Sequence, residues 1–168
     1  MDGDFRKPKN IEPGKSAGGY GFSVSSKGDP CGTDFMSGKV MCVDVRKNEI
    51  TYYDTGDVNN FPRRGRTDLQ DRFWFGLYGG NAINMLDMHT GKMSTWKWST
   101  PYTTPYLATV PDKDGYIYSS SNTSERLLRL NPKTGEMVEF PMPNGPGNFD
   151  TKKINYDPTT KKKVLLFA

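Results

Sequence analysis

Two adjacent arginines, Arg63 and Arg64, are the residues of this sequence whose types and spacing point most directly to chemistry. A guanidinium group presents paired N–H donors that match the two oxygens of a carboxylate or phosphate group. Two such groups side by side therefore form a candidate anion site. The sequence leaves a second interpretation open, in which both charges lie on an exposed loop and pair with Asp57 or Asp68.

The elements that would position these arginines are short hairpins that recur along the chain. Residues 125–143 hold two apolar runs on either side of the turn Asn131–Gly135, a pattern typical of a β-hairpin. Similar segments begin near Val40 and Ile83, so the hairpin recurs at intervals of 43 and 44 residues. Asn48 takes the place of the turn glycine in the first copy, and Asn tolerates the positive φ that such a turn needs.

A second type of hairpin alternates with the first and is expected four times, so the sequence predicts fourteen strands. Repeats of this length with four strands each predict an all-β protein of the β-propeller type, in which each four-stranded antiparallel unit is one blade. The chain then holds about three and a half blades. We assign residues 18–168 to this partial propeller. Residues 1–17 are polar and contain two prolines, and we expect them to form an N-terminal arm.

Candidate ligand-binding residues follow from this architecture. The innermost strand of each propeller blade lines the central axis, and ligands meet the loops that lead into it and the loops between the second and third strands. Tyrosines at these places supply flat walls, and arginines supply charge, so we expect a small anionic ligand. The residues predicted to bind it are Tyr20, Arg63, Arg64, Tyr78, Asn81 and Tyr106.

Short phrases recur in the repeats. They are Phe73-Trp74-Phe75, Asp112-Lys113-Asp114-Gly115, Leu86-Asp87 with Thr90-Gly91-Lys92, and Leu130-Asn131 with Thr134-Gly135-Glu136. In these phrases the chain resembles the virginiamycin B lyase (streptogramin lyase) family of β-propellers. The resemblance covers roughly residues 18–168 and implies the repeat fold, whereas function depends on the site that a fold carries.

The lyases of that family open a cyclic antibiotic ester by metal-assisted chemistry that uses histidine and glutamate near the axis. That reaction needs a base and metal ligands, and the single histidine here, His89, falls in an outer hairpin turn. We therefore predict no catalytic residue, metal site or cofactor. The favoured function is a non-catalytic module that binds a small ligand or a protein partner. The alternatives are a lyase-like enzyme whose catalytic residues lie outside this chain, and a self-assembling structural fragment.

Charge and hydropathy limit the other function classes. The net charge of +4 comes largely from Lys152-Lys153 and Lys161–Lys163, which indicate solvated turns rather than a nucleic-acid surface. No apolar run has the length of a membrane-spanning helix. We expect neither nucleic acid nor a membrane as partner. Because an open sheet edge invites pairing, we expect self-association through the terminal strands.

Two cysteines, Cys31 and Cys42, are predicted on adjacent strands. The sequence leaves open whether they form a cross-strand disulfide or remain two buried thiols. No Cys-x-x-Cys motif is present, so a structural zinc site is not expected. The first residues do not resemble a signal peptide, and the cellular location stays undetermined, with export after processing left open.

Overall fold

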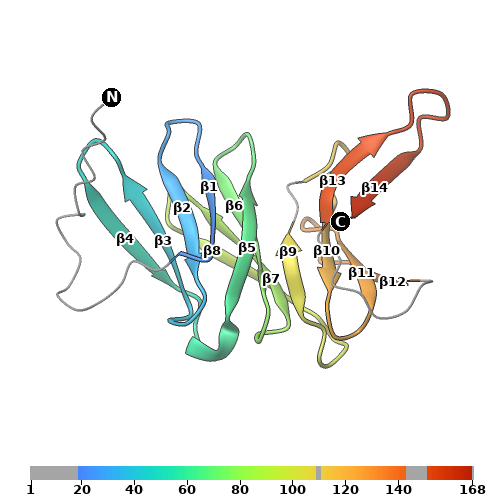
Figure 1. Cartoon of the computed structure of the whole chain (residues 1–168), viewed down its shortest axis with the longest axis horizontal. Coiled ribbons are helices and arrows are strands. Elements are labelled where there is room, and N and C mark those ends of the chain that lie inside the picture. The colour runs from blue at the N-terminus through green and yellow to red at the C-terminus, as the bar shows by residue number, and fades with distance from the viewer. Residues whose placement is uncertain (1–18, 109–110, 143–150, 168) are drawn as a thin grey trace.

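The computed structural model describes residues 19–108, 111–142 and 151–167, which form fourteen β-strands and one short 3-10 helix, η1 (Val58–Asn60). Three sets of four antiparallel strands lie side by side in Figure 1, and within each set the spatial order of the strands is their order in the chain. This meander is the topology of a propeller blade. The predicted all-β fold of about three and a half propeller blades is confirmed.

The three blades and the half-blade have the following strands. Blade I contains β1 (Gly21–Val24), β2 (Pro30–Asp34), β3 (Lys39–Asp44) and β4 (Glu49–Asp54). Blade II contains β5 (Pro62–Thr67), β6 (Arg72–Leu77), β7 (Ala82–Asp87) and β8 (Met93–Lys97). Blade III contains β9 (Pro105–Ala108), β10 (Ile117–Ser121), β11 (Arg126–Leu130) and β12 (Met137–Pro141). The half-blade contains β13 (Thr151–Tyr156) and β14 (Lys163–Phe167).

The blades converge at their innermost strands β1, β5 and β9. Strands β5 and β9 run parallel and share the register pair Arg64–Leu107, which joins blades II and III into one continuous sheet. Strand β1 lies against β5 on the other side, where the backbone nitrogen of Thr67 donates to the Ser23 hydroxyl at 2.9 Å. A Cβ at Gly21 would lie 3.1 Å from the Arg64 Cα, so a residue without a side chain allows this close approach.

Side chains at the strand ends hold the hairpin turns and explain the recurring Asp and Asn of the sequence repeats. The side-chain oxygens of Asp44, Asp87 and Asn131 each accept a hydrogen bond from the backbone nitrogen two residues later, at 2.9–3.1 Å. The turns close with residues at positive φ, including Asn48 (58°) and Gly135 (78°), as the sequence predicts. These turns are therefore set by local chemistry.

The core lies between the blades because each blade buries both faces of its sheet. Alternate residues of β6 point to opposite faces, so Phe73 and Phe75 pack towards blade I, whereas Trp74 packs towards blade III. Each of the three is 1% exposed or less. At Gly76 a Cβ would lie 2.3 Å from the Pro105 carbonyl oxygen, so blade III can approach β6 only at a glycine.

A disulfide joins Cys31 on β2 to Cys42 on β3. The two residues are direct register partners, with their Cα atoms 4.1 Å apart, and Cys31 is fully buried between blades I and II. Of the two alternatives that the sequence leaves open, the structure shows the disulfide. The predicted arm at residues 1–17 lies outside the described residues. Within the residues that the structure describes, no helix has the length and apolar character of a membrane span.

Candidate functional site

Aromatic and arginine side chains gather at one end of the innermost strands, where these strands begin and the second strands of the blades end. Neighbouring strands in a blade are antiparallel, so these starts and ends meet at the same edge. We call this group the Arg63 cluster. Its members are Tyr20, Phe35, Phe61, Arg63, Arg64, Tyr78 and Tyr106.

The Arg63 guanidinium lies at the centre of the cluster, with aromatic rings on several sides. Its Cζ atom is 3.9 Å from the ring centroid of Tyr106, 4.8 Å from that of Tyr78 and 4.9 Å from that of Tyr20. The Phe35 ring follows at 5.4 Å. A cation over the face of an aromatic ring is attracted by the ring quadrupole, so the rings hold the side chain in place without neutralising its charge.

Two tyrosine hydroxyls form the polar part of the cluster. The Nη2 group of Arg63 donates to the Tyr20 hydroxyl, and the hydroxyls of Tyr20 and Tyr106 are 3.4 Å apart. The bond with Tyr106 lowers the pKa of Tyr20, and the Arg63 guanidinium adds to this effect against the opposing effect of burial. The same bond, together with burial, raises the pKa of Tyr106. Tyr20 is therefore the first of the two to ionise.

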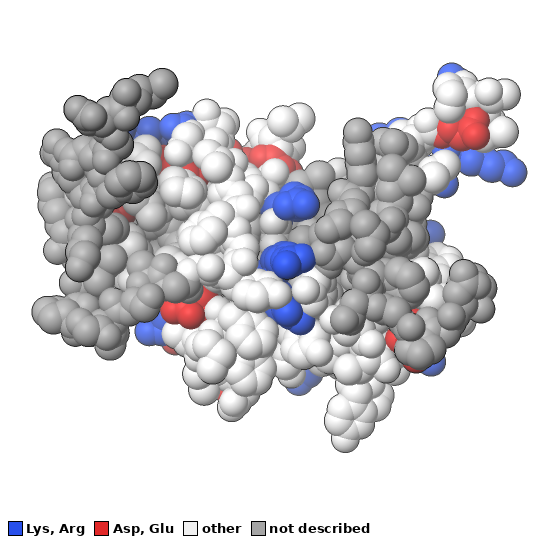
Figure 2. Space-filling model, viewed as in Figure 1, with Lys and Arg blue, Asp and Glu red and all other residues white. Residues whose placement is uncertain are grey.

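The second arginine of the pair stands beside the same two tyrosines. The Arg64 Cζ atom lies 5.5 Å from the ring centroids of both Tyr20 and Tyr106. Two guanidinium groups therefore share one pair of tyrosine rings at this end of the innermost strands. Figure 2 shows basic side chains in a row in the middle of this face, over the region of β5.

The carboxylates that the sequence offered as partners for the arginines are engaged elsewhere. Asp57 caps η1 and accepts from the backbone nitrogen of Asn59 at 2.8 Å. Asp68 binds the Arg72 guanidinium at 2.7 Å and the indole Nε1 of Trp74 at 2.9 Å. Among the residues that the structure describes, no carboxylate forms an ion pair with Arg63. The interpretation as a loop charge paired with Asp57 or Asp68 therefore does not hold for Arg63.

Five of the six predicted site residues come together in the cluster, and Asn81 has a different role. Its side-chain amide donates to the carbonyl oxygens of Trp98 and Thr100, at 3.0 and 2.8 Å. Asn81 thus ties the turn after β6 to the segment that follows β8. Its contacts in the structure are with this segment rather than with Arg63.

Two phenylalanines outside the predicted set, Phe35 and Phe61, also belong to the cluster. The Phe35 ring stacks on Phe61 with centroids 5.1 Å apart and lies 5.6 Å from Tyr20. The signal for Phe35 is present in the sequence, because Phe35 and Tyr78 are 43 residues apart and so take equivalent places in two repeats. Phe61 sits just before β5 at positive φ (44°), a conformation that sequence patterns do not reveal for this residue type.

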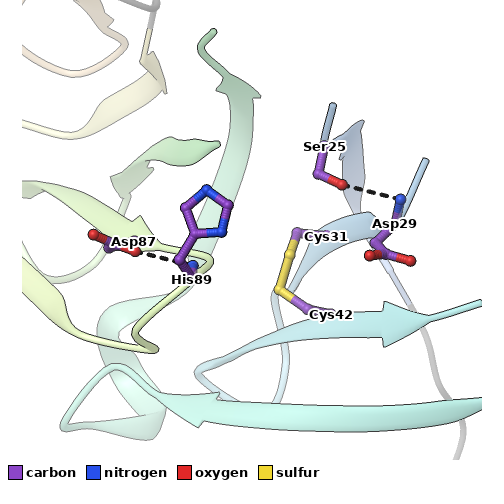
Figure 3. The surroundings of a disulfide bond; sticks show 6 residues. All are labelled: Ser25, Asp29, Cys31, Cys42, Asp87 and His89. Carbon is purple, nitrogen blue, oxygen red and sulfur yellow. Dashed lines mark hydrogen bonds between the residues drawn. A yellow bond between two sulfur atoms is a disulfide. The ribbon is translucent and has the colours of Figure 1, made fainter. Parts of the chain in front are cut away.

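His89 lies at the opposite end of blade II, as its turn position predicts. Its ring is exposed, and Nε2 is 3.4 Å from the Asp71 carboxylate. Figure 3 shows the backbone nitrogen of His89 bonded to Asp87, with the disulfide of blade I on the neighbouring sheet. Asp71 in turn accepts from the backbone nitrogen and hydroxyl of Ser26, at 2.6 and 2.7 Å. The hydrogen-bonding role of Asp71 is to connect blades I and II.

A cleft of about 350 Å³ opens at this same end, between blades I and II. The charged groups that line it are largely paired with one another: Arg46 with Asp29 and Lys47 with Asp44. Within the described part of the chain, no three His, Cys, Asp or Glu side chains gather in a way that would hold a metal ion. The Arg63 cluster is the stronger candidate site because, within the described residues, no carboxylate pairs with the Arg63 guanidinium.

Comparisons with known proteins agree with the propeller architecture. No protein-family model and no curated protein matches the sequence. Among solved structures, virginiamycin B lyase from Staphylococcus aureus is similar at 22% identity with a TM-score of 0.70, over 78% of this chain and 43% of that chain.

Two further solved structures show the same architecture. Hydrazine synthase from Kuenenia stuttgartiensis matches 88% of this chain and 43% of that chain, at 16% identity and a TM-score of 0.63. A putative 6-phosphogluconolactonase from Bacteroides uniformis matches 87% of this chain and 46% of that chain, at 15% identity and a TM-score of 0.58. The chain therefore spans less than half the length of each of these proteins. At such identities the likeness establishes the fold, and the chain has the β-propeller fold found in virginiamycin B lyase.

Proposed function

We propose that this chain is a non-catalytic propeller module that binds a small anionic ligand at the Arg63 cluster. The observation that carries the proposal is the guanidinium of Arg63, held between aromatic rings at 3.9–5.4 Å without a carboxylate partner among the described residues. A buried or half-buried charge is costly unless an opposite charge or hydrogen-bond acceptors compensate it. A carboxylate or phosphate group would provide both.

The aromatic surround supports a ligand that carries an apolar or sugar-like body beside its anionic group. The rings orient Arg63, so less conformational entropy is lost when an anion binds. The Nε of Arg63 is buried and makes no hydrogen bond to any described residue, so the guanidinium is not fully satisfied by the described part of the fold. The two tyrosine hydroxyls add hydrogen-bonding groups beside the charge.

The test is an NMR titration of the arginine side-chain N–H signals with inorganic phosphate and with glucuronate at constant ionic strength. We expect saturable shifts at Arg63 and Arg64, and an affinity that falls at least about tenfold in Arg63→Gln, since a charge-assisted hydrogen bond contributes roughly 1.5–3 kcal/mol. Arg46→Gln is the matched control, because Arg46 is an exposed arginine at the opposite end of blade I. Unchanged affinity for both anions in Arg63→Gln would contradict the proposal.

A second candidate is a lyase-like enzyme whose remaining catalytic residues lie outside this chain. The likeness in fold to virginiamycin B lyase favours it, together with the coverage of 43% of that protein. His89 does not support it, because this residue contacts Asp71 at the end of blade II opposite to Arg63. If the chain alone opened a streptogramin ring above the background rate and His89→Ala abolished that activity, the non-catalytic proposal would fail.

A further inference from the structure

We infer that β5 forms a linear binding track for an extended oligoanion, with Arg63 and Arg64 at one end and Arg66 further along the strand. The inference rests on the proposed function, because the first anionic group of the ligand would occupy the Arg63 cluster. It adds a third contact residue and a ligand class: a chain molecule that carries several anionic groups.

Three of the six residues of β5 are arginines. Residues rise by about 3.3 Å along a strand, so Arg63 and Arg66 start roughly 10 Å apart. On the face that Figure 2 shows, basic side chains follow one another in a row over β5. A single small anion can contact the arginines at only one end of this row. A chain molecule with several anionic groups can contact Arg63 and Arg66 at the same time.

A β-bulge explains how two consecutive residues of one strand, Arg63 and Arg64, can both place their guanidinium groups near the Tyr106 ring. Pro62 pairs with Leu77 and Gly65 pairs with Phe75, so β5 has one more residue than β6 in this stretch. In a bulge two residues oppose one, and the side chains are re-aimed. Arg63 and Arg64 are the residues of this irregular stretch, which accounts for both guanidinium groups lying within 5.5 Å of the Tyr106 ring.

The third arginine, Arg66, lies further along the same strand. Arg64 and Arg66 are two residues apart, and such residues share a face. Arg66 also pairs directly with Trp74, whose side chain packs towards blade III. Arg66 therefore lies on the face of β5 towards blade III, whereas the guanidinium groups of Arg63 and Arg64 lie near the rings of both Tyr20 and Tyr106.

Arg66 is exposed, and no ion pair joins it to a carboxylate in the part of the chain that the structure describes. The nearest acidic residues along the chain have other partners. Asp68 binds Arg72 and Trp74, and Asp71 binds Ser26. Within the described ranges the charge of Arg66 therefore has no acidic partner and is available to a ligand.

Two kinds of molecule present such a row of charges: oligophosphates and oligosaccharides of acidic sugars. Their shared property is an anionic group on each successive unit. The probes are inorganic tripolyphosphate and trigalacturonate, each compared with its monomer, inorganic phosphate or galacturonate. Linking anionic groups turns later contacts into intramolecular ones, so we expect each suitable trimer to bind at least about tenfold more tightly than its monomer.

The experiment measures these affinities by calorimetry at one ionic strength for the whole chain and three variants. In Arg66→Gln the advantage of the trimer should fall at least fivefold, while monomer affinity stays within twofold. In Arg63→Gln both affinities should fall. Lys97→Gln is the matched control, because Lys97 is an exposed cation on the outer strand β8, and it should leave both unchanged.

Each outcome has a defined consequence. Either trimer showing the Arg66-dependent advantage supports the track and identifies its chemical class. Trimers that bind no more tightly than monomers, or an equal loss in Arg66→Gln and Lys97→Gln, overturn the track. In that case Arg63-dependent binding of the monomers would still uphold the proposed function, so the two proposals fail separately.

Discussion

At the scale of single residues, the Arg63 cluster shows how a charge can be fixed by neutral groups. Rings on several sides hold the guanidinium, and one hydroxyl accepts from it. An ion pair would have fixed the side chain as well, but it would also have cancelled the charge that an anionic ligand needs. The choice of tyrosine and phenylalanine around Arg63 is therefore consistent with a binding role.

The hydroxyl pair gives a prediction that needs no ligand. In Tyr106→Phe the pKa of Tyr20 should rise towards the ordinary tyrosine value of about 10, because the hydrogen bond that contributes most to its lowering is removed. Tyrosine ¹³Cζ shifts measured by NMR during an alkaline titration give the pKa directly. Tyr52→Phe, on outer strand β4, should leave the Tyr20 titration as it is. A Tyr20 titration unaffected by the loss of Tyr106 would count against the described geometry.

At the scale of elements, blade I has two contacts that the hairpin pattern does not include. The disulfide joins β2 to β3, and the bond between Ser26 and Asp71 connects the first turn of blade I to the first turn of blade II. The disulfide lies within blade I, whereas the Ser26–Asp71 bond helps to set how blades I and II stack, and this stacking positions the Arg63 cluster.

Removal of the disulfide should destabilise blade I. The cysteines are 11 residues apart, so the loop that the bond closes is short, and the expected loss in the double variant Cys31→Ala/Cys42→Ala is about 2–3 kcal/mol of unfolding free energy. Urea denaturation with and without a reductant measures it. Reduction should destabilise the unmodified chain by a similar amount and leave the double variant unaffected. Equal stability of the oxidised chain and the double variant would argue against the bond.

The contact between blades I and II should make stability depend on pH. Hydrogen bonds from Ser26 lower the pKa of Asp71, against the effect of burial. A carboxyl with a lowered pKa in the folded state stabilises the fold above its unfolded pKa of about 3.9, and this stabilisation is lost as the pH falls through the lowered value. Ser26→Ala should therefore lower the unfolding free energy by about 1–2 kcal/mol at pH 7 and by less in acid.

Urea denaturation at several pH values checks this dependence on Asp71. Ser99→Ala is the control, because Ser99 is exposed and lies after β8. If Ser26→Ala lowers the unfolding free energy by the same amount at neutral and acidic pH, the contact does not depend on the ionised Asp71 carboxylate.

At the scale of the whole molecule, the half-blade is the part with the least strand pairing. Strand β14 pairs with β13, and no other described strand pairs with it. Lys163 anchors the half-blade to blade III through Asp112, the Tyr118 hydroxyl at 3.1 Å and Asp114 at 3.1 Å. Burial disfavours the charge of Lys163, but these bonds outweigh it and raise its pKa.

We propose that the chain self-associates through its terminal strands, most simply as a two-fold dimer. An unpaired strand edge offers backbone donors and acceptors to a second copy. Light scattering at roughly 50 µM, well above the dissociation constant of a stable interface, should give twice the chain mass. Val164→Lys, on β14, should shift the distribution towards monomer, because a lysine on an edge strand opposes pairing. If the unmodified chain and the Val164→Lys variant both have the mass of a monomer, this assembly is excluded.

The amino-acid sequence by itself determined the strands, the turns and their repetition, because these depend on neighbours along the chain. Asn48 and Gly135 occupy turns that need positive φ, and a side-chain oxygen such as that of Asp87 caps the backbone two residues later. The sequence also placed Arg63 and Tyr106 at the starts of innermost strands, since the repeat interval aligns them. Local hydrogen bonds and steric limits on φ suffice for all of this.

The tertiary structure alone decided which of these residues meet. The stacking of blades brings Phe35 and Phe61 against Arg63 and removes Asp68 from it, since Asp68 binds Arg72. In the folded chain the Asn81 amide also donates hydrogen bonds to carbonyl groups after β8, and so it does not join the cluster. These outcomes depend on distances between blades that are set by how buried side chains fill the space between sheets, and no pattern within one repeat contains that information.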